Sequence, residues 1–227
     1  MNTMLNRKRI YLAGGVVIIF LLLVFIGIFV IYQKREDKKD DYRSDLGSGI
    51  VIQAVSEYSG AFVEDGSDRD VKNVWALTVT NTSDQDIQYL RIKGTDGDNS
   101  AYFDITTLTA GSTVKVLESS SAEYPAWEKD CVYSIENLAL FNQDRSLYPE
   151  LFTVSTQDGW IKVENKGTEN ITNDVYVYYK NVEDNEFLGG ITYRLKFEGG
   201  IPAGESREEQ AVHYKSDVSK IMYLTYE

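Results

Sequence analysis

The sequence predicts an all-β fold, organised as β-sandwiches behind a single N-terminal transmembrane helix. Three observations lead to this prediction: an uncharged apolar run close to the N-terminus, period-two alternation of apolar and polar residues after it, and a set of turn residues that occurs twice. The apolar run predicts the helix, the alternation predicts the strands, and the repeated turns divide the chain into two parts.

The apolar run extends over Leu12–Ile31, twenty residues without a charged side chain. A helix rises about 1.5 Å per residue, so this run is long enough to cross the ~30 Å hydrocarbon core of a bilayer. Tyr11 and Tyr32 flank it, where amphipathic rings favour the headgroup level. A cleaved signal peptide is the alternative, but its apolar part is usually only ~7–15 residues long. We expect a tail over residues 1–11 and a transmembrane helix over residues 12–32.

The charges beside the apolar run indicate its orientation. Three basic residues precede it and four follow it closely, so the count of Lys and Arg alone does not decide. The first 32 residues contain no acidic residue, however, as is typical of a signal-anchor. We expect a single-pass protein of the cell membrane, with a cytoplasmic N-terminus and an extracytoplasmic C-terminal part.

The part after the apolar run is strongly acidic. All 35 acidic residues and 20 of the 23 basic residues follow Tyr32, which gives that part a formal charge of −15. Nucleic acid and anionic lipid headgroups repel such a surface, so nucleic-acid binding is excluded, whereas basic protein surfaces stay compatible with it. The single cysteine, Cys131, rules out an intrachain disulfide, which fits a bacterial cell-envelope protein better than a small secreted domain of animal origin.

Residues 33–49 are predicted to form a charged, flexible linker, because they mix both signs of charge and end in Gly-Ser-Gly. Beyond them, Ile191 to Phe197 alternates between apolar and polar residues, as a half-buried strand requires. Other runs rich in Val, Ile, Thr, Tyr or Phe are separated by clusters of Gly, Asn, Asp and Ser. They predict strands over Ile50–Val55, Val71–Asn81, Ile87–Lys93, Tyr102–Thr106, Thr113–Leu117, Phe152–Thr156, Val175–Lys180 and Ile221–Tyr226.

The repeated turn residues indicate one supersecondary plan that is used twice. Asn81 is followed six residues later by Ile87, and Asn165 is followed by Ile171 at the same spacing. In each case a strand should end at the Asn, whose side chain can bond nearby backbone groups, and the Ile should open the next strand.

A second pair of landmarks supports the repeat. The segment Leu108–Ser112 contains an Ala-Gly turn before a strand, and Ile201–Glu205 contains another. We therefore expect two β-sandwich domains, over residues 50–147 and 148–227.

The order of these features resembles the FxLyD-type domains. The resemblance is carried mainly by the second repeat, through the Asn turn, the strand Val175-Tyr-Val-Tyr-Tyr179 and the following Ala-Gly-Glu turn. The family consists of small immunoglobulin-like β-sandwiches outside bacterial and archaeal membranes, so the resemblance implies tandem immunoglobulin-like domains without enzymatic activity or catalytic residues. The chain departs from the family at Tyr178-Tyr179-Lys180, where the aromatic-Asp stretch would be expected.

Few residues could support catalysis. His213 is the only histidine and Cys131 the only cysteine, so neither a two-histidine metal site nor a thiolate zinc site can form within one chain. The Gly-x-Ser-x-Gly pattern of a serine nucleophile is also absent. The many carboxylates do not exclude a carboxylate-dependent hydrolase. The composition nevertheless favours a protein that is not an enzyme and needs no cofactor.

Two acidic segments are candidate calcium sites, because Ca²⁺ binds oxygen ligands on loops. Neither segment matches the EF-hand spacing, and polar turn residues are the simpler interpretation. The candidate ligands are Asp65, Asp68, Asp70, Asp96 and Asp98.

Aromatic residues provide the candidate binding surface. The chain has 16 tyrosines, and Tyr176, Tyr178 and Tyr179 lie in one predicted strand, on both of its faces. Tyrosine is enriched at binding surfaces because it offers a large contact area at a low entropic cost. The alternation also predicts that Trp75 points into the core and that Trp160 lies on the rim.

These observations favour a non-enzymatic interaction or structural module of the cell envelope that binds protein partners. An alternative is an accessory subunit of a membrane protein complex, whose transmembrane helix packs against partner helices through Gly14, Gly15 and Gly27. A hydrolase is the third interpretation.

Overall fold

The computed structural model describes residues 43–97, 99–124 and 131–226. The predicted tail, the predicted transmembrane helix and most of the predicted linker lie outside this range. In the described residues no helix is long and apolar enough to cross a membrane. Residues 42–227 form one compact unit.

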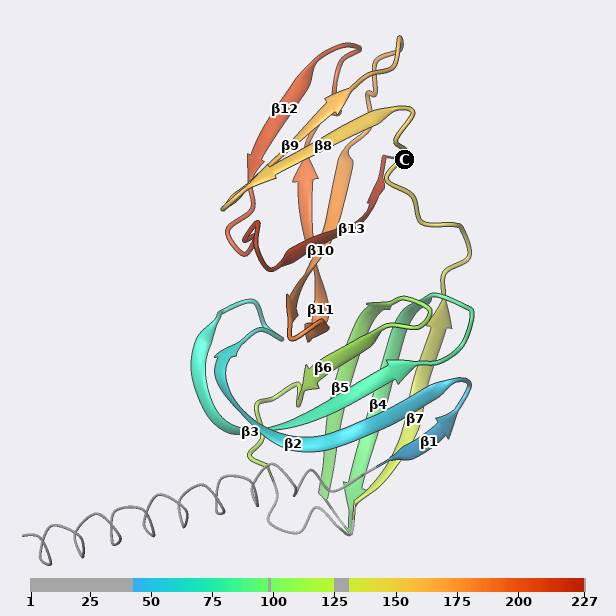
Figure 1. Ribbon diagram of the computed structural model, residues 1–227, viewed down its shortest axis with the longest axis vertical. Coiled ribbons are helices and arrows are strands. Elements are labelled where there is room, and N and C mark those ends of the chain that lie inside the picture. The colour runs from blue at the N-terminus through green and yellow to red at the C-terminus, as the bar shows by residue number, and fades with distance from the viewer. Residues whose placement is uncertain (1–42, 98, 125–130, 227) are drawn as a thin grey trace, which may run out of the picture. The chain divides into compact units, whose positions relative to one another are not determined.

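The described part of the chain is all-β, as predicted, and its strands form three sheets (Figure 1). The largest sheet has seven strands in the order β1-β2-β3-β6-β11-β10-β13, and the two smaller sheets have the orders β5-β4-β7 and β12-β9-β8. The strands are β1 (Ser44–Gly47), β2 (Ile50–Phe62), β3 (Arg69–Asn81), β4 (Ile87–Asp96), β5 (Asn99–Leu108), β6 (Thr113–Leu117), β7 (Val132–Leu140), β8 (Phe152–Gln157), β9 (Trp160–Asn165), β10 (Val175–Glu183), β11 (Glu186–Phe197), β12 (Ser206–Gln210) and β13 (Ser219–Thr225).

The two larger apolar cores of the described residues lie between these sheets, and a smaller third cluster consists of Phe62, Val63, Val74, Ala76 and Leu117. The first is made by side chains of β2, β3 and β6 together with those of β4, β5 and β7, and Trp75 packs edge-on against Phe103 and Tyr133 within it. The second is made by β10, β11 and β13 together with β8 and β9. Trp75 is 5% exposed and Trp160 is 39% exposed, which confirms the orientation predicted for each side chain.

The end of the predicted linker differs from the expectation. Ser44–Gly47 forms β1 and pairs with β2 rather than remaining flexible. Gly47, Ser48 and Gly49 all have positive φ, so Gly-Ser-Gly makes the tight turn of a hairpin, and Leu46 packs against the first core.

The two asparagines of the sequence repeat are both fully buried and make the same hydrogen bonds. Asn81 donates through Nδ2 to the carbonyls of Gln85 (2.8 Å) and Leu108 (3.1 Å). Asn165 donates in the same way to Glu169 (2.8 Å) and Ile201 (3.0 Å). The repeated asparagines therefore occupy the same local structure, but the prediction for the isoleucines holds only once: Ile87 opens β4, whereas Ile171 forms an isolated bridge with Ile201 and β10 begins at Val175.

The backbone turns that follow are also equivalent. Gly111 donates its N–H to the Asn81 carbonyl, and Gly204 donates to the Asn165 carbonyl. The N–H of each asparagine in turn donates to the carbonyl of the residue after the glycine, which is Ser112 for Asn81 and Glu205 for Asn165.

Strand β11 connects the two cores. Its first residues pair in parallel with β6, through Phe187 opposite Val114, and on their other edge with the end of β10; its later residues pair with the start of β10. Between these stretches the ladder with β10 is interrupted: Tyr179 is opposite Tyr193, but Asn181 is opposite Leu188. The extra residues of β11 leave ladder hydrogen bonds unformed, so their backbone groups need other partners.

Two charged side chains supply these partners. Lys180, which is fully buried, donates through Nζ to the carbonyls of Gly190 (2.8 Å), Ile191 (2.9 Å) and Thr106 (3.0 Å). The Glu64 carboxylate accepts N–H groups from Gly190 (2.9 Å) and Leu117 (2.8 Å). The backbone groups involved come from β5, β6 and β11, so the charged side chains join strands of both cores.

Candidate functional site

The strand with the predicted tyrosine cluster alternates between two environments. In β10, Val175, Val177 and Tyr179 are buried in the second core, whereas Tyr176 and Tyr178 are half-buried on the opposite face. The structure thus brings Tyr176 and Tyr178 together on one face and places Tyr179 on the other. We call the side of the sheet that carries Tyr176 and Tyr178 the tyrosine face; it consists of Tyr176, Tyr178, Arg194, Lys196 and Tyr223, with Phe141 and Arg145 packed on it. Tyr223 itself is buried, at 8% exposure.

Tyr178 is the centre of the tyrosine face. Its ring stacks on Tyr223, the residue opposite it in β13, with ring centroids 4.3 Å apart and planes inclined by 11°. Phe141, from the segment after β7, also contacts Tyr223, in an edge-on arrangement. Because these rings lie on paired strands and support one another, the aromatic surface is held in a fixed orientation before any partner arrives.

Cationic groups border these rings. The Arg194 guanidinium lies 5.0 Å from the centre of the Tyr176 ring, and Arg145 lies 5.0 Å from Phe141 and 5.7 Å from Tyr223. Lys196, opposite Tyr176 in the ladder, forms an ion pair with Asp174 (2.9 Å). The tyrosine face is therefore aromatic and partly basic within a chain whose net charge is −12.

An open cleft of about 460 Å³ adjoins Phe141. It lies between the turn that precedes β4 and the segment that follows β7. Its lining is mainly polar and acidic, and consists of Asp84, Gln85, Asp86, Leu140, Phe141, Asn142, Gln143 and Asp144.

Asp86 connects the cleft to the tyrosine face. It forms an ion pair with Arg145 and accepts the N–H of Ala110 (2.8 Å). Burial would raise the pKa of Asp86, but these two donors hold it below its ordinary value. Arg145 is thereby fixed between the cleft and the aromatic rings.

Tyr179 belongs to a separate aromatic cluster on the core side. It stacks on Tyr193 and meets Tyr214 edge-on, and burial raises the pKa of Tyr179 to about 12. His213 stacks on Tyr193, and its Nδ1 lies 2.9 Å from an Asp68 carboxylate oxygen. Tyr179 and His213 thus have packing partners that explain their positions, and Tyr179 is not available at the surface.

The candidate calcium ligands do not converge. Asp65 accepts the N–H of Ser67 and pairs with Arg69, Asp68 pairs with His213, and Asp70 is exposed at the start of β3. The backbone of Asp96 belongs to β4, and Asp98 lies outside the described residues. Across the described ranges no group of three or more His, Cys, Asp or Glu side chains is placed to hold a metal ion.

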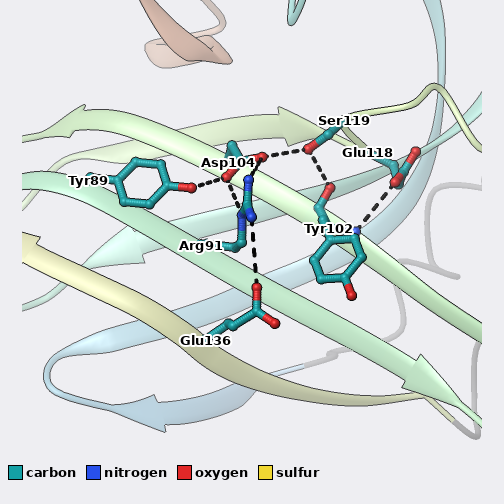
Figure 2. A network of polar contacts seen from close by, with 7 residues as sticks. All are labelled: Tyr89, Arg91, Tyr102, Asp104, Glu118, Ser119 and Glu136. Carbon is teal, nitrogen blue, oxygen red and sulfur yellow. Dashed lines mark hydrogen bonds and ion pairs between the residues drawn. The ribbon is translucent and has the colours of Figure 1, made fainter.

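A network of polar contacts lies on the outer side of β4, β5 and β7 (Figure 2). The Asp104 carboxylate accepts hydrogen bonds from Tyr89, from Arg91 (2.7 and 3.0 Å) and from Ser119 (3.0 Å). Arg91 also lies 3.9 Å from Glu136.

These donors account for the state of the Asp104 carboxylate. Burial would raise its pKa, but the hydrogen bonds from Arg91, Tyr89 and Ser119 hold it below the ordinary value. Both oxygens are occupied by side chains of the protein, so the network is better suited to stabilising the sheet than to general acid–base chemistry.

Comparisons of the chain with protein-family models, with curated proteins and with solved structures found no match.

Proposed function

We propose that this chain is a membrane-anchored, extracytoplasmic β-sandwich protein that serves as a non-enzymatic interaction module of the cell envelope. Its tyrosine face would bind a protein partner. The observation that carries the proposal is the rigid stack of Tyr178 on Tyr223, with Arg194 and Arg145 at its border. Pre-ordered Tyr and Arg side chains commonly contribute a large share of the binding energy at protein interfaces.

The membrane anchor is supported by the sequence. The uncharged run Leu12–Ile31 is the predicted span, and the charge of −15 beyond it favours a soluble extracytoplasmic part. The tandem immunoglobulin-like arrangement is supported by the equivalent hydrogen bonds of Asn81 and Asn165, which recur 84 residues apart in sequence numbering.

Site-specific photo-crosslinking tests the proposed binding face. A photoreactive phenylalanine analogue is incorporated at Tyr178 of the full chain, and membranes of the native source are irradiated. Tyr102 provides the matched control, because it is also half-buried but lies on the outer side of β5. We expect a discrete adduct from position 178 and none from position 102.

Two other outcomes would change the conclusion. An adduct that forms from Phe20, in the predicted membrane segment, but not from position 178 would favour the accessory-subunit alternative. Equal labelling from positions 178 and 102 would contradict a specific tyrosine face.

Protease accessibility tests the topology independently. Protease added to intact spheroplasts should digest residues 43–227 while leaving a cytoplasmic control protein intact. Digestion that requires opening the membrane would show the reverse orientation.

A further inference from the structure

Strand β8 is an edge strand without a charged residue. It pairs with β9 alone within the described part of the chain, and its sequence is Phe-Thr-Val-Ser-Thr-Gln (Figure 1). The opposite edge of the same sheet, β12, carries Arg207, Glu208 and Glu209. Natural proteins usually protect an open edge with charges or proline, because its unpaired backbone groups can bind another strand.

The register with β9 shows which backbone groups of β8 point outward. The hairpin closes at Gln157 and Trp160 around a two-residue loop, so this pair exchanges both backbone hydrogen bonds. Hydrogen-bonded pairs alternate along an antiparallel ladder, and Ser155 and Thr153 therefore also use their backbone groups on β9. The N–H and C=O groups of Val154 and Thr156 face away from β9.

The side chains of β8 itself are uncharged on both faces, and the nearest charged ones on the outer face are Lys162 and Glu164 of β9, opposite Ser155 and Thr153. Thr153, Ser155 and Gln157 are exposed on the outer face. On the other face Val154 is partly buried against the second core, and Thr156 accepts a hydrogen bond from Tyr214.

We propose that β8 is a self-association edge, where two copies of this chain pair antiparallel about a two-fold axis at Ser155. In this register Val154 of each copy lies opposite Thr156 of the other, so their outward backbone groups form hydrogen-bonded pairs. Ser155 meets its own symmetry mate, and Thr153 meets Gln157. The pairing joins two three-stranded sheets into one continuous sheet.

The charge of the chain indicates that the strand pairing with the open edge of β8 comes from a second copy. The chain carries a net charge of −12, so most of its surface repels another copy, whereas β8 brings only uncharged side chains together in the proposed register. Cross-strand pairs such as Val with Thr are favourable, and like charges directly opposite are not. A basic partner strand would find no carboxylate on β8 itself.

The contact is small compared with the ~1,000 Å² of a stable interface, so it needs a high local concentration. That concentration would come from confinement in one membrane, a point that rests on the proposed anchor.

Disulfide trapping in membranes tests the register. The full chain carries Cys131→Ala together with one new cysteine, and mild oxidation is followed by non-reducing electrophoresis. Opposed residues that do not exchange hydrogen bonds have Cα atoms about 4.5 Å apart, which a disulfide can bridge. We expect Ser155→Cys to give dimers several-fold above Glu208→Cys, an exposed control on the β12 edge. Thr153→Cys alone and Gln157→Cys alone should give no dimer. Chains with Thr153→Cys should form disulfides with differently tagged chains that carry Gln157→Cys when the two are coexpressed.

A proline variant tests the backbone contacts. Adding Val154→Pro to Ser155→Cys removes an outward N–H and should lower the dimer yield to that of Glu208→Cys. A dimer yield for Ser155→Cys no higher than for Glu208→Cys, or the same yield for all positions, would overturn the proposal. Fractionation of the same cells reports separately on the anchor, so a failed anchor and a failed register are distinguishable.

Discussion

Lys180 and Glu64 bind the same residue, Gly190, at its two polar groups: Lys180 donates to the carbonyl and Glu64 accepts the N–H. The interrupted ladder of β11 creates the need for both side chains. Three carbonyl acceptors surround the Lys180 ammonium, which matches its three hydrogens. The junction between the two cores therefore depends on charges that are removed from water.

Replacing Lys180 with Met should change how stability depends on pH. Burial lowers the pKa of Lys180 from 10.5 to about 7, and Glu64 offsets part of this effect. Between these two values the unfolded chain binds more protons than the folded chain, so the lysine makes stability rise with pH, by up to about 1.4 kcal/mol per unit. The difference in unfolding free energy, wild type minus Lys180→Met, should rise from pH 7 to 10.5 in urea titrations of residues 43–227.

The matched control is Lys220→Met, which changes an exposed lysine on the neighbouring strand. Its difference from wild type should stay nearly constant with pH. A constant difference for Lys180→Met as well would show that Lys180 does not titrate with a lowered pKa.

Gly190→Ala should be among the most destabilising single changes. A Cβ at this position would overlap the carbonyl oxygen of Asp104 and crowd Val116, and backbone cannot move aside cheaply. We expect a loss of more than about 3 kcal/mol in thermal or urea unfolding. Gly199→Ala, where a Cβ meets open space but φ is positive, should lose only about 1 kcal/mol. Similar losses for the two variants would argue against the close approach at Gly190.

Asn81→Ala and Asn165→Ala should destabilise the protein to a similar extent. Each change leaves the same pattern of buried carbonyl groups without a donor, at a cost of about 1–3 kcal/mol. Chemical unfolding of both variants measures the effect, and Asn142→Ala at an exposed position is the control. A neutral effect at one asparagine alone would show that the two turns are not energetically equivalent.

Trp75→Ala should cost about 3–5 kcal/mol, and Trp160→Ala should be mild, because only the first side chain is buried. The division into independent domains at residues 147 and 148 stays a prediction. The parallel pairing of β6 with β11 and the buried Lys180 lead us to expect one cooperative transition instead. Hydrogen exchange should therefore show faster opening of β10 and β13 in Trp75→Ala, and unchanged protection of those strands would support independent domains.

Alternation located most strands because apolar faces repeat with period two, and it failed where the ladder is irregular. Strand β7 contains a register shift, so that Tyr133 and Ile135 are followed by Leu138 rather than by an apolar residue at 137. Strand β12 is a charged edge strand that buries little apolar surface. Neither strand shows a strict alternation: β7 was not predicted, and β12 was predicted only through the Ala-Gly turn of Ile201–Glu205 that precedes it.

The tyrosine face was predictable only in part. Tyr176 and Tyr178 share a face by simple alternation. Phe141, Arg145 and Tyr223 reach that face through tertiary contacts and strand pairing, which one sequence does not disclose. The burial of Lys180 was not predictable for another reason: lysine is rarely buried, and the role of this lysine depends on the irregularity of β11.

The pairing of β6 with β11 also sets the order in which the protein can be completed during synthesis. Strand β6 can pair with β3 as soon as residue 117 is available. The other edge of β6 pairs with residues 187 and 188, which are synthesised later. At ~5–20 residues per second, that edge stays open for several seconds or more while the intervening chain emerges. Until residues 187 and 188 are available, that edge of β6 can pair with a wrong strand, so a chain that ends before β11 is expected to aggregate more readily than the complete chain.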